Sequence, residues 1–413
     1  MNREKSLRVY INDKFEGILS NDENGKFAFQ YDKSAKMALS LSLPKREEIF
    51  LNEYCNGFFN GLLPEAEETR RMLGQKYSIN PNNDFAILQA IGYDCPGAVS
   101  FLGETDENNL AEYYEIKGEN IDEVELEKFI NNLPNKPLGT GAKNLRLSLA
   151  GAQTKTAVLL INNEITLPEK FTPTTHILKP MIKGLKETVE NEYICMKTAE
   201  KIGIKVPNIE IRNAGKTNFL LIERFDREIL AGKIKRLHQE DFCQAKNIAS
   251  AYKYENDGGI NFKDAFEILR KTSNVATSIK QFLNLLIFNF LILNNDAHGK
   301  NFSIIHKENG DIEFAPAYDI LCTKAYSKMT RNMAMEIGGC YNVGNVTPVH
   351  FKRLANEVGI SYPLFSNLIK EQCEILPDIL RDVSSSFENK IGDKMFTIVA
   401  KHCNKTSKLF SKK

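Results

Sequence analysis

The sequence lacks several features that would place it in an obvious class of protein. Its 54 basic and 53 acidic side chains nearly cancel, which argues against attraction of the whole chain to nucleic acid or to an anionic membrane. The eight cysteines form no Cys-x-x-Cys pair and most sit among apolar neighbours, so a reducing compartment is expected. The first residues are charged and lead directly into a predicted strand, which predicts neither a secretory signal nor a transit peptide.

Long hydrophobic runs are also missing. The most apolar stretch, residues 282–293, is interrupted by Asn284 and Asn289 and is shorter than the ~20 residues that cross a bilayer. We therefore expect a buried helix there and no membrane association. The six histidines show no metal spacing, which argues against zinc. At 413 residues the chain is too long for one compact core, so two or three domains are expected.

The patterns that are present change along the chain. Residues 7–32 alternate between apolar and polar positions, with Asn24-Gly25 as a hairpin turn, which predicts an antiparallel meander. The period becomes helical over residues 45–91. Further on we predict a helix over 122–133, strands over 145–161 and 176–180, a helix over 187–202, two strands over 209–225, and a mainly helical remainder after Asp226 with one hairpin flanking 306–311.

Strands that come first and helices that come later predict an α+β protein of two lobes with a cleft between them. The polar, turn-rich loop after residue 133 marks a boundary or connector. We divide the chain into an N-terminal α+β module (1–120), the rest of the N-terminal lobe (121–225) and a helical C-terminal lobe (226–413).

The strongest chemical signal lies in Asp296-Ala-His298-Gly-Lys300-Asn301. A carboxylate five residues before an Asn matches the spacing with which protein kinases orient a hydroxyl and hold a metal. Asp319 follows after a strand, a hairpin and a second strand, where a second oxygen ligand for Mg²⁺ would be needed. The structural alternative is that Asp296 and Asn301 cap a turn while Asp319 makes a buried ion pair.

Other residues suit the binding of a nucleotide. Lys179 ends an apolar strand and precedes a helix that contains Glu190 and Glu192, of which we prefer Glu192 as its partner. The alternative is a solvated lysine at a strand end. The small, flexible segment 148–156 could bring backbone N–H groups close to phosphates, although it is not a Walker A loop and could be a simple hairpin. The backbone of Glu223 to Phe225 could bind the edge of an adenine ring, with Phe225 as an apolar wall. The alternative is that Phe225 is simply a core residue.

With these residues assembled, the chain resembles a full-length serine/threonine kinase toxin of the HipA type. The resemblance covers nearly the whole sequence and includes Ser148-Leu-Ala-Gly-Ala-Gln-Thr-Lys155 and Asp296-Ala-His-Gly-Lys-Asn301. Other matching stretches are 27–32, 39–44, 63–65, 91–98, 223–226, 239–241, 253–259 and 318–319. The sequence differs from eukaryotic kinases, since it has no Gly-x-Gly-x-x-Gly loop and Asp319 is followed by Ile-Leu instead of Phe-Gly.

The resemblance implies a role for each matching residue. It makes Asp296 the catalytic base, Asn301 and Asp319 the Mg²⁺ ligands, Lys179 a contact to ATP phosphates, and Ser148 a site of autophosphorylation. The implied nucleotide-binding set is Ala150, Gly151, Ala152, Gln153, Thr154, Lys155, Lys179, Glu223, Arg224, Phe225, Gln239, His298, Gly299, Lys300, Asn301, Tyr318 and Asp319.

The resemblance also implies a biological setting. We expect an ATP- and Mg²⁺-dependent kinase of the bacterial cytoplasm that arrests growth by phosphorylating a translation component such as an aminoacyl-tRNA synthetase, and that is bound by a small HipB-like, DNA-binding antitoxin. Lysines at the C-terminus leave a weak DNA contact open. The alternatives are a small-molecule or lipid phosphotransferase of kinase-like fold, and a non-catalytic co-repressor scaffold.

Overall fold

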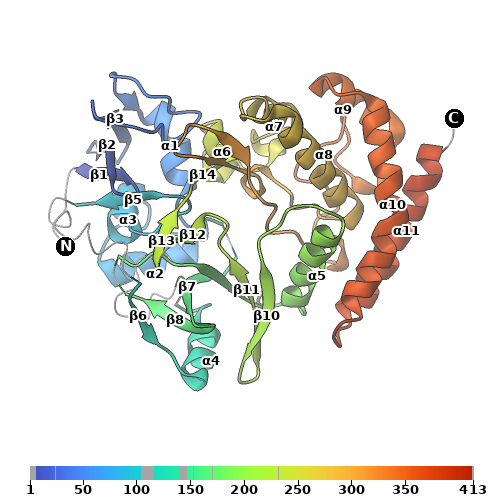
Figure 1. Cartoon of the computed structure of the whole chain (residues 1–413), viewed down its shortest axis with the longest axis horizontal. Coiled ribbons are helices and arrows are strands. Elements are labelled where there is room, and N and C mark those ends of the chain that lie inside the picture. The colour runs from blue at the N-terminus through green and yellow to red at the C-terminus, as the bar shows by residue number, and fades with distance from the viewer. Residues whose placement is uncertain are drawn as a thin grey trace. The chain divides into compact units, whose positions relative to one another are not determined.

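The computed structural model describes residues 6–23, 25–103, 116–136, 138, 147–151, 153–169, 171–230 and 232–411. The chain forms two compact units (Figure 1). Unit 1 consists of Met1–Ile182, Arg212–Ala251 and Ile304–Asp311. Unit 2 consists of Lys183–Ile211, Tyr252–Ser303 and Ile312–Lys413. The chain therefore crosses between the units several times, and each unit is described separately below.

The first sheet of unit 1 is the predicted meander with two added strands. Its order is β4-β3-β2-β1-β5, and the pairs are antiparallel. The predicted turn between β2 and β3 includes Asn24, which lies outside the described residues, and Gly25, whose φ of 78° suits glycine. The strands are β1 (Ser6–Ile11), β2 (Lys14–Asn21), β3 (Phe27–Tyr31), β4 (Phe50–Leu51) and β5 (Val99–Leu102).

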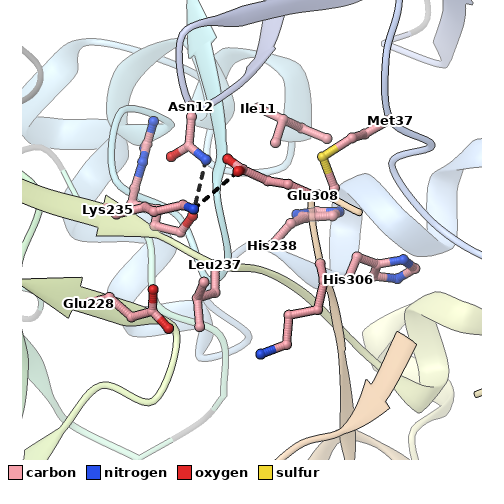
Figure 2. A pocket seen from close by; sticks show the side chains of 11 residues that line it. Ile11, Asn12, Met37, Glu228, Lys235, Leu237, His238, His306 and Glu308 are labelled. Carbon is pink, nitrogen blue, oxygen red and sulfur yellow. Dashed lines mark hydrogen bonds and ion pairs between the residues drawn. The ribbon is translucent and has the colours of Figure 1, made fainter. Parts of the chain in front are cut away.

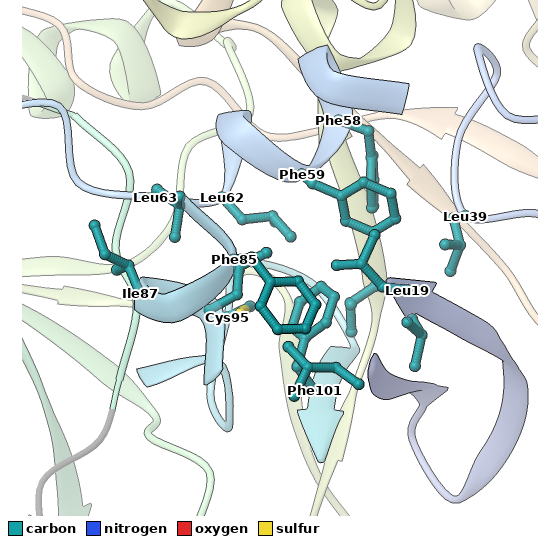
Figure 3. Close-up of a cluster of buried hydrophobic side chains, with 14 of the residues drawn as sticks. Leu19, Leu39, Phe58, Phe59, Leu62, Leu63, Phe85, Ile87, Cys95 and Phe101 are labelled. Atoms are coloured by element: carbon teal, nitrogen blue, oxygen red, sulfur yellow. The ribbon is translucent and has the colours of Figure 1, made fainter. Parts of the chain in front are cut away.

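Three helices lie in the predicted helical stretch. They are α1 (Asn52–Gly61), α2 (Glu67–Tyr77) and α3 (Asp84–Ile91). Helices α1 and α3 contact this sheet, and α2 packs on α3. Helix α1 packs on β3 and β4, and its own side chains Phe58 and Phe59 are fully buried (Figure 3). Because burying one such side chain contributes ~1.5–3 kcal/mol, these two residues hold helix α1 on the sheet.

A second sheet of unit 1 has the order β10-β11-β9-β7-β8-β6. Strand β9 lies in its interior, antiparallel to both β7 and β11, which places Lys179 opposite Leu220. Helix α4 (Glu123–Asn132), which the sequence predicts and which Asp122 caps, packs on β11. The strands are β6 (Gly118–Asn120), β7 (Thr156–Ile161), β8 (Glu164–Pro168), β9 (His176–Pro180), β10 (Ile209–Ala214) and β11 (Thr217–Glu223).

The sequence prediction was wrong for the segment just after Asp226. Instead of helix, the chain forms the hairpin β12 (Arg227–Leu230) and β13 (Lys233–Arg236), then β14 (His238–Asp241), which pairs with β15 (Ser303–His306). The inward positions of the hairpin are occupied by two opposed arginines, Arg227 and Arg236, both buried. Ile234 is the only other buried side chain of the two described strands, so the apolar alternation of a strand is weak. A short helix, α6 (Phe242–Ala245), follows.

The buried Arg227 belongs to an ion network that surrounds the predicted adenine segment. Its guanidinium donates to Asp94 at 2.7 Å, and Arg224 donates to Asp226 at 2.9 Å. Burial alone would raise the pKa of Asp94, but the charges of Arg227 and Arg224 outweigh this effect and hold the pKa below its usual value. The Asp226 carboxylate also accepts the N–H of Gly97. The end of β11 is therefore tied firmly to the N-terminal module.

Unit 2 is mainly helical, as predicted for the C-terminal part of the chain. Helix α10 packs against α5, α8, α9 and α11, and Phe282 of α8 contacts Phe266, Phe302 and Phe314 edge to face. The helices are α5 (Thr188–Lys201), α7 (Phe262–Leu269), α8 (Val275–Ile292), α9 (Pro348–Val358), α10 (Tyr362–Ser384) and α11 (Ile391–Ser411), and the short strand β16 (Ile312–Phe314) also belongs here.

Helix α8 contains the apolar stretch noted in the sequence and is longer than expected. By length and composition alone it is the one helix, among the described residues, that could cross a membrane. Most of its apolar window is buried inside the protein, between α7, α10 and α11. A core helix of a globular domain shows the same composition, so α8 is the predicted buried helix.

Candidate active site

The catalytic-loop motif begins where helix α8 ends. Leu293 adopts the left-handed conformation with a φ of 63° and closes the helix. The next residues are held from two sides, because the Asn295 N–H donates to Thr323 Oγ1 at 2.9 Å and the Asn295 carboxamide donates to the Thr330 carbonyl at 2.9 Å. The Asn295 carbonyl in turn accepts the N–H of Ala334 at 2.8 Å. These hydrogen bonds therefore fix the backbone immediately before Asp296.

Asp296 and Asn301 meet at a single backbone amide. The N–H of His298 donates to the Asp296 carbonyl at 2.8 Å and to Asn301 Oδ1 at 3.2 Å. The short 3-10 helix Gly299–Asn301 brings the two residues back toward each other. The five-residue spacing thus folds into one compact loop, as the sequence predicts.

Asp319 is brought to the same place from a later part of the chain. Asn301 Nδ2 donates to Asp319 Oδ2 at 3.0 Å. Asp319 has a φ of 58°, a left-handed conformation that aspartate adopts more readily than most residues. The two predicted metal ligands are therefore side by side within unit 2.

The donor set of this pair suits a hard cation. A carboxylate and a carboxamide offer oxygen atoms, and Mg²⁺ usually binds through one or two protein groups together with water and phosphate oxygens. No group of three or more His, Cys, Asp or Glu side chains that could hold a metal is found among the described residues. Asn301 and Asp319 thus fit Mg²⁺ better than zinc.

His298 is held in a neutral state within the loop. Burial, assisted by the positive charge of Lys253, lowers the pKa of His298 to about 3. Its Nδ1 atom is buried and has no hydrogen-bond partner in the part of the chain that the structure describes. The imidazole can therefore contribute hydrogen bonding near the site, but not a positive charge at neutral pH.

Lys300 and Tyr318 help to shape the loop. The Tyr318 hydroxyl donates to the Lys300 carbonyl at 2.8 Å and lies 2.6 Å from the hydroxyl of Ser303. Gly299 and Lys300 are buried in the 3-10 turn. These contacts fix the backbone between Asp296 and Asp319, and a direct role of Gly299, Lys300 or Tyr318 in nucleotide binding stays a prediction.

The predicted phosphate lysine lies in unit 1. Lys179 is buried, at 5% exposure, on the central strand β9. Glu190 and Glu192 are on α5 of unit 2. The pairing of Lys179 with Glu192, and the approach of Lys179 to the metal ligands, remain predictions.

The predicted phosphate loop follows a buried serine. Ser148 donates its hydroxyl to the Leu62 carbonyl at 2.6 Å and its N–H to the Asp94 carbonyl at 3.0 Å. Gly151 has a φ of 100° and forms a bridge with Pro64. Two segments of the N-terminal module thus hold residues 147–151.

Only parts of the loop beyond Gly151 are described. Ala152 lies outside the described residues, and the roles of Gln153 and Thr154 in nucleotide binding stay predictions. Lys155 donates to the Ala150 carbonyl at 2.9 Å, and a Cβ atom on Gly151 would lie 2.7 Å from its Nζ atom. The glycine therefore allows the lysine to fold back over the loop.

The predicted adenine segment ends strand β11. Glu223 pairs with His176, and the Arg224 N–H donates to the Thr175 carbonyl at 2.9 Å. The Arg224 side chain is committed to Asp226 and Asp94, so only the backbone around Glu223 to Phe225 is suited to meet a base. Gln239, on β14, has a buried Oε1 atom without a hydrogen-bond partner among the described residues.

A separate cavity of about 110 Å³ lies in unit 1 (Figure 2). It is lined by Asn12, His238, His306, and the ion pair of Lys235 with Glu308 at 3.1 Å, among others. Pockets that bind nucleotide-sized ligands usually measure roughly 300–1,000 Å³. None of the predicted site residues lines this cavity, so its size and lining both argue against it as the nucleotide site.

Some residues around the site were not assigned a role from the sequence. Tyr254 donates its hydroxyl to Asp296 Oδ1 at 2.8 Å, across 42 residues of chain. Thr323 accepts the N–H of Asn295, which lies 28 residues earlier. The stretch 253–259 supported the family resemblance, but spacing alone could not show which atom its tyrosine would meet.

Comparison with known proteins identifies the family. The HipA N-terminal domain matches residues 7–102, and the HipA-like C-terminal domain matches residues 147–380. "Putative kinase Y4mE" of Sinorhizobium fredii is 39% identical over 393 residues, which cover 92% of this chain and 93% of that protein. This chain belongs to the HipA family.

Other HipA-family proteins agree over nearly the full length. The "Serine/threonine-protein kinase toxin HipA" of Shewanella oneidensis is 27% identical over 395 residues, which cover 92% of this chain and 89% of that protein. A solved complex of Shewanella oneidensis MR-1 HipA with HipB and operator DNA contains a chain of the same fold, with a TM-score of 0.85, 24% identity and 98% coverage of both chains. The predicted two-lobed, kinase-like α+β fold is therefore confirmed.

Proposed function

We propose that this HipA-family chain is an ATP- and Mg²⁺-dependent serine/threonine protein kinase and the toxin of a type II toxin–antitoxin pair. The observation that supports this most directly is the hydrogen bond between the side chains of Asn301 and Asp319 in unit 2. Asn301 Oδ1 also accepts the same His298 N–H as the backbone carbonyl of Asp296, so Asp296 begins the same loop. The HipA relative of Shewanella oneidensis is named as a serine/threonine kinase toxin, which favours the same chemistry here. A translation component, such as an aminoacyl-tRNA synthetase, is the proposed target.

Each residue of the loop has a proposed task in phosphoryl transfer. Asp296 accepts the proton of a serine or threonine hydroxyl as the oxygen attacks the γ-phosphorus of ATP, whose bond to the bridging oxygen breaks to release ADP. Asn301 and Asp319 hold Mg²⁺, which neutralises negative charge on the ATP phosphates when bound. The rigid hydrogen bonds around Asn295 keep the base in one position, which matters because small misplacements of a catalytic group slow the reaction strongly.

The residues of unit 1 have proposed tasks in binding ATP. Lys179 contacts the phosphates, with Glu192 as its partner, and the loop of residues 150–155 covers them. The backbone of Glu223 to Phe225 meets the adenine ring, and Gln239 and His298 line the site. The buried ion network of Arg224 with Asp94 and Asp226 supports this assignment, because it would hold the adenine-binding backbone still.

The partners of the chain are proposed by analogy. The relative of similar fold was solved with HipB and operator DNA, so a small DNA-binding antitoxin is the proposed regulator of this chain. The nearly balanced charge of the chain does not favour strong direct DNA binding, and the lysines of α11 offer only a weak contact. A cytoplasmic location in a bacterial cell is consistent with these proposals.

The deciding experiment compares wild type with Asp296→Asn, which keeps the size of the side chain and removes its basicity. Wild type incubated with radiolabelled ATP and Mg²⁺ in a cell extract should label protein, and the variant should transfer label at least about 100-fold more slowly, as expected for loss of a general base. Induced wild type should arrest growth and the variant should not. As a control, Asp257→Asn changes an exposed carboxylate and should behave as wild type.

The rival functions predict different outcomes. Label that appears on metabolites or lipids instead of protein would indicate a small-molecule phosphotransferase. Equal growth arrest by wild type and Asp296→Asn would reject the kinase and favour a non-catalytic co-repressor scaffold.

A further inference from the structure

Tyr254 makes a direct contact with the proposed catalytic base. Its phenolic hydroxyl donates to Asp296 Oδ1 at 2.8 Å. The tyrosine ring also meets the ring of His298 edge on, with centroids 5.2 Å apart and an angle of 82° between the planes. The hydroxyl and the ring thus touch two residues of the catalytic loop at once, and all three residues belong to unit 2.

The backbone around Tyr254 is anchored to the same frame as the loop. The Glu255 N–H donates to the Ala334 carbonyl at 3.2 Å, and the Ala334 N–H donates to the Asn295 carbonyl at 2.8 Å. One residue, Ala334, therefore connects the neighbour of Tyr254 with the neighbour of Asp296. The side-chain bond between Tyr254 and Asp296 closes a ring of contacts among three segments that are far apart in the sequence.

The turn after Tyr254 has no space for a side chain at Gly259. The Gly259 N–H donates to the Tyr254 carbonyl at 2.9 Å. A Cβ atom at Gly259 would lie 2.3 Å from the Tyr252 carbonyl and 2.7 Å from the Tyr254 carbonyl, so no side chain fits there. The tight turn fixes the backbone from which the tyrosine side chain extends.

We propose that Tyr254 is a positioning residue that orients the carboxylate of Asp296 for phosphoryl transfer. The terminal torsion of an aspartate side chain is soft, and a short hydrogen bond to one oxygen fixes the plane of the carboxylate. The edge contact with His298 limits rotation of the tyrosine ring. Tyr254 acts through Asp296 and holds no phosphate or metal. This inference rests on the proposed kinase function.

The test is Tyr254→Phe in the full-length chain, which removes one oxygen atom and keeps the ring. The probe is transfer of radiolabel from ATP, with Mg²⁺, to the chain itself and to dephosphorylated casein. Because a hydrogen bond to a charged group is lost, kcat should fall roughly tenfold or more while the KM for ATP changes less than about twofold. Tyr252→Phe, at a side chain that is 56% exposed, should leave both values unchanged.

Parallel measurements separate this inference from the proposed function. If wild type transfers no label, or if Asp296→Asn equals wild type, the kinase itself is rejected and the positioning role falls with it. If Asp296→Asn is inactive but Tyr254→Phe keeps the wild-type kcat, only the positioning role is rejected. The positioning role is also rejected if the loss of kcat matches a loss of folded protein measured by circular dichroism. It is rejected as well if the KM for ATP rises by the same factor as kcat falls.

Discussion

Glu255, the neighbour of Tyr254, carries a carboxyl group that its surroundings make difficult to ionise. Burial is the largest cause, and the nearby negative charges of Glu336, Glu357 and Asp264 act in the same direction. The N–H of Glu336, which donates to the Glu255 carboxylate at 2.6 Å, opposes them. The net effect raises the pKa of Glu255 to about 7. This residue should therefore titrate close to physiological pH.

The raised pKa predicts how stability depends on pH. The folded protein binds a proton on Glu255 more tightly than the unfolded chain does, so its contribution is fully present below about pH 4.5 and is lost as pH rises through about 7. Glu255→Gln keeps an oxygen for the Glu336 N–H and removes the charge. At about pH 8 we expect the variant to be more stable by about 1 kcal/mol, a value reduced because the group is partly exposed to solvent.

Urea unfolding at about pH 5 and about pH 8 checks this prediction. The advantage of Glu255→Gln should be clear at the higher pH and should shrink at the lower one. Asp257→Asn, an exposed change in the same turn, is the control and should show no such difference. An advantage of equal size at both pH values would point to packing instead of ionisation.

At the scale of elements, helix α1 depends on a glycine at its contact with the loop after α6. A Cβ atom at Gly57 would lie 2.2 Å from the backbone carbon of Asn247. The Asn247 carboxamide accepts the Gly57 N–H at 2.8 Å and donates to the Glu53 carbonyl at 2.6 Å. The loop therefore sits directly on the helix surface, with no space for a methyl group.

Gly57→Ala should consequently destabilise the N-terminal module. Helix propensity would favour alanine by ~1 kcal/mol, but the clash with backbone atoms forces a shift that costs typically about 1–3 kcal/mol or more. We expect a net loss of stability, measured as a lower midpoint of urea unfolding. Glu53→Ala, at an exposed position of the same helix, should change the midpoint much less. If Gly57→Ala were more stable than wild type, the loop at Asn247 would be able to move away from the helix at little cost, and the prediction would be wrong.

The elements themselves differ in how far the sequence could predict them. Strands with apolar alternation, such as residues 7–11, and helices with apolar residues at helical spacing, such as the one after Asp122, were predicted closely. The hairpin of β12 and β13 was missed because two of its three buried positions are Arg227 and Arg236, which make ion pairs and hydrogen bonds inside the protein. A pattern based on hydrophobicity cannot register buried charges that are stabilised by partners elsewhere in the chain.

The site shows the same division. The proximity of Asn301 to Asp296 could be predicted because both residues lie in one loop, whereas the catalytic role of Asp296 and the metal-binding roles of Asn301 and Asp319 stay predictions. The contact of Tyr254 with Asp296 could not be predicted, because it depends on how the turn at Gly259 and the frame at Ala334 place two distant segments. Local spacing predicts a motif, whereas its supporting contacts require the fold.

At the scale of the whole molecule, the N-terminal module and the proposed phosphate loop are physically linked. Ser148 is fully buried, and its hydroxyl and N–H bond the carbonyls of Leu62 and Asp94. A phosphate on this oxygen would add roughly 1.5 to 2 negative charges where a carbonyl acceptor now lies. A phosphorylated Ser148 therefore cannot keep these contacts, and residues 147–151 must leave the module.

This argument predicts the result of incubating the chain with ATP and Mg²⁺. Intact-mass analysis should show about one added phosphate on wild type, and none on Asp319→Ala or Ser148→Ala. Ser34→Ala, which removes an exposed serine of unit 1, should still gain it. The phosphorylated chain should also be cut faster by protease between residues 147 and 155, because the released segment loses its hydrogen bonds. A phosphorylated chain with unchanged protease resistance there would show that the module tolerates the modification, and would remove the physical basis for self-inactivation at Ser148.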